Sequence, residues 1–309
     1  MKERICKVHV AQYEVSLPVN SMLKNTYKIK EVIATSKLSI VYIGELVTGG
    51  KPVTIKEYFP KEIALRDLDN LTVINRLPST KQKFEEFKAT FLNEALILKQ
   101  INHPHIVNYI DHFEGNGTIY IIMDYCEGKL LDQYIKNIPV NNRVHLYTSI
   151  FVPLIDALGY LHKKEIIHRD IKPSNIMIDL EGKPFLLDFG SAIFYKNTKE
   201  YQIFTSPSYS PLEQYSNVSE QRVYTDVYSL AATFYYFLTN IIPPDISQRL
   251  MEDKIEKIRK HNKRVTILFS YIIMWGMTVQ AKKRCPSLKF MKFGILFEEF
   301  VNGIRNYFK

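Results

Sequence analysis

The stretch from Ile166 to Gly190 constrains the fold of this chain more than any other. It contains two short apolar runs, Ile176–Ile178 and Phe185–Leu187, joined by a polar segment that includes Gly182. Short apolar runs that are separated by a turn with glycine are typical of a β-hairpin. The sequence therefore predicts two antiparallel strands at this place.

Polar side chains lie on both sides of the predicted hairpin. Asp170 and Asn175 precede its first strand, and Asp188 follows its second strand. We expect the closed hairpin to bring these three side chains close together. Neighbouring carboxylates repel each other unless a cation or a proton transfer makes use of them. Since Asp and Asn oxygens suit a hard cation such as Mg²⁺, the pattern predicts proton transfer or cation binding here.

The same stretch resembles the catalytic and metal-binding loops of the protein kinase family. The family patterns H-R-D-x-x-x-x-N and D-F-G are matched in full, from His168 to Asn175 and from Asp188 to Gly190. The resemblance implies that Asp170 accepts or orients the proton of a substrate hydroxyl and that Lys172 neutralises the moving γ-phosphate. It also implies that Asn175 and Asp188 hold Mg²⁺ with ATP, and the place of Lys172 implies specificity for Ser or Thr.

Segments upstream extend the resemblance. Val53–Lys56 is similar to the V-A-I-K strand of the family, in which the Lys pairs with the α- and β-phosphates. A helix is predicted to begin at Ser79, where Gln82 would complete a capping box. Glu94 falls on the apolar stripe of this helix, where a carboxylate needs a partner. We expect an ion pair of Lys56 with Glu94; the alternative is a partly exposed Glu94 at the edge of the stripe.

The loop that covers the ATP phosphates departs from the family pattern. Tyr27–Ile33 and Ser39–Glu45 are predicted to be paired strands that flank this loop, whose pattern in the family is G-x-G-x-x-G-x-V. The three glycine positions hold Ala34, Ser36 and Ser39. Because Ala and Ser resist positive φ, we expect a loop that is stiffer or differently shaped.

The resemblance also implies a set of nucleotide contacts. Met123 would be the gatekeeper, and backbone groups of Asp124 and Cys126 would hydrogen-bond adenine in a hinge between two lobes. Cys126 is therefore interpreted as a backbone contact and not as a reactive thiol. The implied nucleotide-binding residues are Ile33, Ala34, Ser36, Ser39, Val41, Thr54, Lys56, Met123, Asp124, Cys126 and Met177.

Residues 191–213 resemble an activation segment. Ser206 stands where Ser/Thr-specific members carry a Thr whose hydroxyl bridges the catalytic Asp and Lys. By resemblance, Glu213 would pair with Arg284, and Asp226 would hold the backbone of the catalytic loop.

Arg169 directly precedes Asp170, and in the family an Arg there commonly receives a phosphate on the activation segment. We expect autophosphorylation at Thr198, or else at Thr205. The alternative is a segment ordered by packing alone, with Arg169 paired to a carboxylate such as that of Glu200.

Composition narrows the class of protein. The chain of 309 residues is 46% hydrophobic and 24% charged, which is typical of a globular protein. A net charge of +9 would suit nucleic acid or a membrane surface, but the Lys residues are scattered, so we interpret it as a solvated basic surface and expect no nucleic-acid partner. The cysteines show neither zinc-site nor disulfide spacing, which favours a reducing cytoplasm. Tyr228–Leu238 and Thr266–Val279 are too short to span a membrane and are predicted to be buried helices.

Taken together, the sequence predicts an α+β, bilobal protein-kinase fold. Residues 1–26 form an N-terminal extension, residues 27–124 a small antiparallel β lobe with one helix, and residues 125–309 a larger, mainly helical lobe. The expected reaction is transfer of the γ-phosphoryl group of MgATP to Ser or Thr of a protein. Two alternatives remain: a pseudokinase that binds nucleotide or acts as a scaffold, because the loop lacks its glycines, and, less favoured, a small-molecule kinase.

Overall fold

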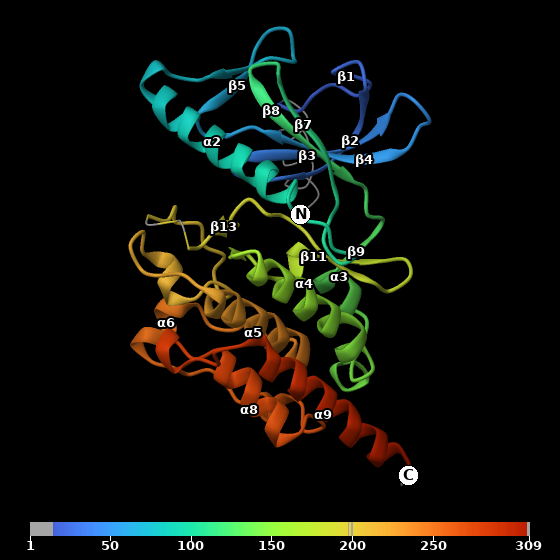
Figure 1. The fold of residues 1–309 in the computed structure, drawn as a ribbon, viewed down its shortest axis with the longest axis vertical. Helices are drawn as coiled ribbons and strands as arrows, with labels where there is room; N and C mark the ends of the chain where they lie inside the picture. The colour runs from blue at the N-terminus through green and yellow to red at the C-terminus, as the bar shows by residue number, and fades with distance from the viewer. Residues whose placement is uncertain (1–14, 197, 199, 308–309) are drawn as a thin grey trace, which may run out of the picture. The chain divides into compact units, whose positions relative to one another are not determined.

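The computed structural model describes residues 15–196, 198 and 200–307, so most of the predicted N-terminal extension lies outside the described residues. The chain forms two compact units. The first contains the residues up to Ile101 together with Val107–Cys126, and the second contains Asn102–Ile106 and the residues from Glu127 onward. The first unit is built mainly of strands and the second mainly of helices (Figure 1).

The first unit is a curled antiparallel sheet with one long helix. Its six-stranded sheet has the order β1-β2-β3-β4-β8-β7, and β5 pairs separately with β6. The predicted pairing of the strands that flank the phosphate loop is confirmed by β2 and β3. The elements are β1 (Met22–Leu23), β2 (Tyr27–Thr35), β3 (Ser39–Leu46), β4 (Pro52–Tyr58), β5 (Ala64–Arg66), β6 (Val73–Asn75), α2 (Lys81–Leu98), β7 (Tyr109–Gly115) and β8 (Thr118–Asp124).

The helix α2 packs against the sheet through buried aromatic side chains. The ring of Tyr58 on β4 lies 5.1 Å from the ring of Phe84 and 5.6 Å from that of Phe91. The predicted start at Ser79 with a capping box is wrong, because residues 78–80 form a 3₁₀ turn and no side chain caps α2. Pro78 fixes φ at the first position of this turn, and Gln82 donates instead to Glu86 on the helix surface.

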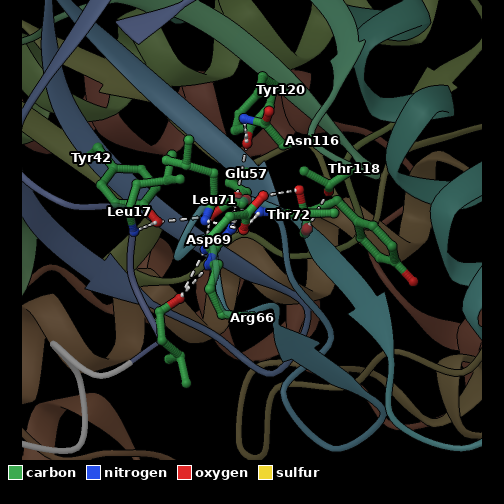
Figure 2. Close-up of polar contacts among 12 residues, drawn as sticks. Leu17, Tyr42, Glu57, Arg66, Asp69, Leu71, Thr72, Asn116, Thr118 and Tyr120 are labelled. Atoms are coloured by element: carbon green, nitrogen blue, oxygen red, sulfur yellow. Dashed lines mark hydrogen bonds and ion pairs between the residues drawn. The ribbon is translucent and has the colours of Figure 1, made fainter. Parts of the chain in front are cut away.

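A buried polar network fixes the connection after β4 onto the sheet (Figure 2). The carboxylate of Glu57 is fully buried and accepts hydrogen bonds from the hydroxyls of Tyr42 and Tyr120, at 2.7 and 3.0 Å. Both terminal nitrogens of Arg66 donate to the same carboxylate, at 2.7 and 2.8 Å, and Arg66 also binds the carbonyl of Val15. A buried charge is tolerated only with such complete pairing.

This network bears on the site because Glu57 directly follows Lys56 on β4. Successive side chains of a strand point to opposite faces of the sheet. The network on one face therefore fixes the strand whose other face carries Lys56.

The second unit is mainly helical. The predicted hairpin of the sequence is confirmed by the antiparallel pair β11 and β12, whose turn has Gly182 at φ +83°. The elements are β9 (Gly128–Leu130), α3 (Leu131–Ile135), α4 (Val152–Lys163), β10 (Ile166–Ile167), β11 (Ile176–Asp179), β12 (Pro184–Leu186), β13 (Ile193–Phe194), α5 (Val223–Thr239), α6 (Ile246–Met251), α7 (Ile258–His261), α8 (Ile267–Gly276) and α9 (Leu288–Tyr307).

The two apolar stretches of the sequence have different environments. The helix α5 is buried over nearly its whole length, which confirms the prediction for Tyr228–Leu238. The prediction of burial is wrong for α8, in which Ile267 is 74% and Tyr271 is 64% exposed. The helix α8 packs against α5, α7 and α9, and its buried residues are Phe269, Ser270, Ile272, Ile273 and Gly276. Among the described residues, no helix is both long enough and apolar enough to cross a membrane.

Candidate active site

The first unit contains the ion pair that the sequence predicts between β4 and α2. The Lys56 ammonium lies 2.7 and 2.8 Å from the two carboxylate oxygens of Glu94. The Lys56 side chain is 10% exposed and that of Glu94 is 2% exposed, and the Phe91 ring lies 5.8 Å from the ammonium. Poor access of water strengthens the attraction between the two charges, so Lys56 is held in one orientation.

The register of the sheet places further predicted residues in neighbouring rows. Ala34 on β2 is opposite Val41 on β3, and Val41 is opposite Lys56 on β4. Thr54 on β4 is opposite Met123 on β8. Ile33, next to Ala34, is 47% exposed.

The loop between β2 and β3 is a closed turn. The N–H of Ser36 donates to the carbonyl of Ser39 at 2.8 Å. The Ser36 hydroxyl accepts from the N–H groups of Leu38 and Ser39, at 3.2 and 3.0 Å. After β4, the N–H of Phe59 donates to the Leu38 carbonyl at 2.8 Å, and that of Lys61 donates to the carbonyl of Lys37 at 3.1 Å.

This turn needs no glycine. All residues from 26 to 48 are described, and none of them has a positive φ. Hydrogen bonds to the Ser36 hydroxyl and from the segment after β4 hold the backbone in this turn, so no flexible glycine is required. The loop thus forms a closed turn without positive φ, and the greater stiffness expected from the missing glycines stays a prediction.

The strand β8 ends at the predicted hinge. The N–H of Asp124 donates to the carbonyl of Asn108 at 2.9 Å. Burial tends to raise the pKa of the Asp124 carboxyl, but hydrogen bonds from Lys51 and Asn108 and the charge of Lys51 lower it overall. Cys126 is half-buried and forms no disulfide.

In the second unit, the carboxylate of Asp170 is the centre of a compact network. One of its oxygens accepts from the hydroxyl of Ser206 at 2.6 Å. The other accepts from Lys172 and from the side-chain amide of Asn175, both at 2.8 Å. Lys172 also donates to the Ser206 hydroxyl at 2.7 Å, so this hydroxyl bridges Asp170 and Lys172 as the resemblance implies.

The geometry of Asn175 fits a cation ligand. Its amide nitrogen donates to both the side chain and the carbonyl of Asp170, which turns Oδ1 away from these bonds and leaves it available to a cation. Asp188 has φ +56°, and the N–H of Gly190 lies 3.3 Å from its Oδ1. Hard oxygen donors of this kind suit Mg²⁺.

A cation at this place would need further ligands. The described residues contain no group of three His, Cys, Asp or Glu side chains arranged to hold a metal ion. Mg²⁺ commonly binds through one or two protein oxygens and completes its shell with phosphate and water. Met177, two residues after Asn175 on β11, is half-buried.

The fully buried Asp226 holds the backbone of the catalytic loop. Its carboxylate accepts from the N–H groups of His168 and Arg169, at 3.0 and 2.9 Å. These bonds stabilise Arg169 at φ +69°, a conformation that is costly for a residue with a side chain. Burial tends to raise the pKa of Asp226, but the hydrogen bond from His162, at 2.8 Å, and nearby charges lower it overall.

Two supporting residues were not predicted. His162 orients the Asp226 carboxylate, and the buried Gln214 donates to the carbonyl of Arg169 at 2.8 Å. Neither belongs to the motifs that identify the site. Their contacts join residues that are far apart in the sequence, so no local signal marks them.

The guanidinium of Arg169 is almost completely buried. It donates to the carbonyls of Ser191 and Gln202, at 3.2 and 2.7 Å, and lies 5.9 Å from the ring of Tyr201. Its Nε has no partner among the described residues, and burial lowers the pKa of the group to about 10. None of the described carboxylates forms an ion pair with Arg169, so the expected alternative of a partner such as Glu200 is wrong.

The end of the activation segment is fixed by a buried ion pair. Two nitrogens of Arg284 lie 2.7 and 3.1 Å from the two carboxylate oxygens of Glu213. The pair predicted from the resemblance is therefore present.

Comparisons with known proteins agree with this geometry. The family model described as "Protein kinase domain" matches residues 63–289. Sperm motility kinase 2A of Mus musculus is 32% identical over 184 residues, which cover 58% of this chain and 34% of that protein. Probable serine/threonine-protein kinase PknB of Lactococcus lactis is 28% identical over 233 residues, covering 72% and 37%. The solved structure "PpkA-294 apo form" has a TM-score of 0.78 at 26% identity, and the match covers 91% of this chain and 99% of that one.

The chain belongs to the protein kinase family, because the family model matches well over half of it. The predicted α+β kinase fold is confirmed. The match to the family model begins after the glycine-free turn and after Lys56. The chain spans about a third of the length of the curated relatives that it matches.

Proposed function

We propose that this chain is an active Ser/Thr protein kinase that transfers the γ-phosphoryl group of MgATP to a protein hydroxyl. The observation that carries the proposal is a network of four side chains. Lys172, Asn175 and Ser206 all donate hydrogen bonds to the Asp170 carboxylate, and Lys172 also donates to the Ser206 hydroxyl. The intact Lys56–Glu94 pair supports it, since that pair serves to position phosphates in kinases.

In the proposed reaction, Asp170 accepts the proton of the acceptor hydroxyl as its oxygen attacks the γ-phosphorus. The new O–P bond forms while the bond from phosphorus to the β–γ bridging oxygen breaks, and ADP leaves. Lys172 balances the charge of the phosphoryl group in transit. Lys56 would bind the phosphates, and Asn175 and Asp188 would hold Mg²⁺, which neutralises phosphate charge when bound. Positioning and electrostatics supply most of the catalysis.

Specificity for Ser and Thr rests on Lys172 and Ser206. The Ser206 hydroxyl lies 2.6 Å from Asp170 and 2.7 Å from Lys172, so this arrangement already accommodates an aliphatic hydroxyl beside both groups. We propose a protein substrate because the activation segment ends in the buried Glu213–Arg284 pair, a feature that small-molecule kinases generally lack.

One observation favours the alternative of a pseudokinase that binds nucleotide or acts as a scaffold. In the closed turn, the N–H groups of Ser36, Leu38 and Ser39 are all used internally. They are therefore not available to phosphates unless the turn opens.

The experiment that separates these functions supplies radiolabelled ATP and Mg²⁺ with a generic basic protein, or with choline and an aminoglycoside. We expect label on the protein, on Ser and Thr by phosphoamino-acid analysis, and none on the small molecules. Nucleotide binding without any transfer would support the pseudokinase. Label on a small molecule alone would support the third class.

We also propose autophosphorylation of the activation segment. The unpartnered Nε of Arg169 supports it, since a buried guanidinium group favours an added anion. Thr198 is the first choice; its hydroxyl donates to the carbonyl of Phe194 at 2.9 Å in the unphosphorylated chain. Thr205 is the second choice.

Mass spectrometry of protein incubated with MgATP tests this proposal, next to a Thr198→Ala/Thr205→Ala variant. We expect phosphate between residues 191 and 212 in the parent protein and reduced activity in the variant. A fully active variant without phosphate in this segment would show that the carbonyl contacts of Arg169 order it on their own.

A further inference from the structure

The outer face of α8 and α9 is apolar and exposed. The two helices lie side by side in the second unit (Figure 1), and each buries its opposite face. On α9, Phe293 is 55% and Phe300 is 65% exposed. The chain thus presents large aromatic side chains to solvent along most of a helix.

Apolar residues on the outer side of α9 follow a regular pattern. Phe290, Phe293, Phe297, Phe300 and Ile304 recur at alternating spacings of three and four; Phe297 is half-buried and the other four are exposed. This spacing places them in one stripe along about 20 Å of helix, at 1.5 Å per residue. A separate stripe that includes the buried Met291 and Ile295 packs inward, so α9 is apolar on two faces.

The stripe continues onto α8. The ring of Trp275 lies 5.4 Å from that of Phe290 and 6.4 Å from that of Tyr271. Ile267, one turn before Tyr271, is also exposed. We call this combined surface the α8–α9 face. Single exposed apolar residues are ordinary, but a contiguous face of this kind marks an interaction site.

The segment of the chain that contains this face is strongly basic. Residues 257–305 contain eleven of the 41 Lys and Arg residues but only two of the 32 Asp and Glu residues, so they carry the whole net charge of +9. Of the two acids, Glu298 is fully buried, and only Glu299 is exposed. The Lys and Arg residues are therefore unevenly distributed along the chain, with their excess over Asp and Glu in this segment.

Exposed cations lie at both ends of the α8–α9 face. At one end, the Trp275 indole donates to the carbonyl of Lys283 at 2.9 Å, which places that basic segment beside the ring. At the other end, Arg305 donates to the carbonyl of Arg264 at 2.8 Å, just before Ile267. The exposed cations at the two ends are Lys282, Lys283 and Lys289, and Lys263, Arg264 and Arg305.

We propose that the α8–α9 face binds an anionic membrane surface and lies flat on the lipid without crossing it. An apolar, aromatic stripe with basic residues around it is the pattern of an interfacial helix. Trp and Tyr favour the boundary between headgroups and acyl chains. Each Lys or Arg near anionic lipid adds to the attraction.

The charges decide between a lipid surface and a second copy of the chain. Pairing two such faces would bring two strongly basic surfaces together, and like charges at an interface oppose association. Anionic lipid supplies both the apolar layer and the opposite charge. The proposal does not depend on phosphoryl transfer and is tested without ATP.

The test is flotation of the full chain with vesicles of phosphatidylcholine, with and without phosphatidylserine. We expect binding to the anionic vesicles at least about tenfold stronger than to the neutral ones, and weaker at high salt. Phe293→Ser/Phe300→Ser should lower the binding about tenfold or more through lost apolar contact. The matched control is Leu250→Ser/Met251→Ser, which removes exposed apolar side chains from α6 and should leave binding unchanged.

A second variant keeps the test decisive if the serine variant fails to fold. Lys282→Glu/Lys283→Glu/Lys289→Glu leaves the apolar residues in place and should abolish the preference for phosphatidylserine. Equal binding by all variants, or no binding to anionic vesicles, would overturn the proposal. So would light scattering that shows, without vesicles, a dimer that Phe293→Ser/Phe300→Ser dissociates, because the face would then bind a second copy.

Discussion

At the scale of single residues, His168 supports the catalytic loop as a neutral ring. It is fully buried, with Nε2 at 3.0 Å from the Leu187 carbonyl and Nδ1 at 3.3 Å from the N–H of Asp170. A carbonyl only accepts and an N–H only donates, so Nε2 carries the proton and Nδ1 carries none. Burial lowers the pKa of His168, although the charges of Asp226, Asp170 and Asp188 oppose this.

This lowered pKa makes stability depend on pH. An unfolded His has a pKa of about 6.5, so below that pH the unfolded chain binds a proton that the folded chain resists. The contribution of His168 is therefore fully present above about pH 6.5 and is lost as the pH falls below that value. The slope is at most about 1.4 kcal/mol per pH unit.

Urea unfolding at pH 8 and pH 5.5 measures this contribution. We expect the free energy of unfolding of the parent protein to fall between the two values, and His168→Gln to fall less. Gln keeps a donor for the Leu187 carbonyl but does not titrate. An identical pH dependence in both proteins would contradict the neutral assignment.

At the scale of elements, the turn between β2 and β3 carries the main departure from the family pattern. Its shape follows from the Ser36 hydroxyl, which accepts two backbone N–H groups, and from the segment after β4 that holds its carbonyls. Side-chain hydrogen bonds restrict the backbone of such a turn, whereas the backbone of a glycine-rich loop can adopt many conformations.

Ser36→Gly should open this turn. We expect the free energy of unfolding to fall by about 1–2 kcal/mol, from lost hydrogen bonds and added backbone entropy. Because the N–H groups of Leu38 and Ser39 become available, KM for ATP should fall severalfold. Ser36→Thr is the control, since it keeps the hydroxyl. Steady-state kinetics that are the same in all three proteins would show that the hydroxyl does not govern the phosphate loop.

The helices show where sequence patterns stop being informative. The run Thr266–Val279 predicts a helix correctly, but apolar content cannot say which face a neighbour will cover, and one side of α8 exposes Ile267, Leu268 and Tyr271. The start of α2 was misplaced because Pro78 favours a tight turn over the capping box that Ser79 and Gln82 would form. The first residue of a helix therefore depends on which of two overlapping sequence patterns, here the tight turn or the capping box, determines the local structure.

At the scale of the whole molecule, the motifs predict the fold and the site residues, while the long-range supports appear only in the structure. Asp170, Asn175 and Lys56 lie in local patterns with a fixed chemical meaning. The Glu57–Arg66 pair joins two ordinary residues whose burial depends on the complete sheet. The carbonyl contacts of Arg169 could not be predicted either. Every residue has a backbone carbonyl, so the sequence does not indicate which carbonyls will accept from Arg169.

Each unit fixes its own site residues through buried ion pairs. Lys56–Glu94 and Glu57–Arg66 lie in the first unit, and Glu213–Arg284 lies in the second. Loss of one partner from a buried pair typically costs about 3–5 kcal/mol, because the other charge stays buried. Variants of these residues therefore confound activity with stability, whereas Asp170 is partly exposed and suits a test of chemistry.

The most direct test of catalysis is single-turnover phosphoryl transfer by Asp170→Asn, with nucleotide affinity measured by calorimetry on the same samples. Asp156→Asn, at an exposed site on α4, is the matched control. We predict that Asp170→Asn folds and binds MgATP nearly as the parent protein does but transfers phosphate about 10²–10⁴-fold more slowly. Transfer at a near-normal rate by Asp170→Asn would contradict the role of Asp170 and with it the proposed mechanism.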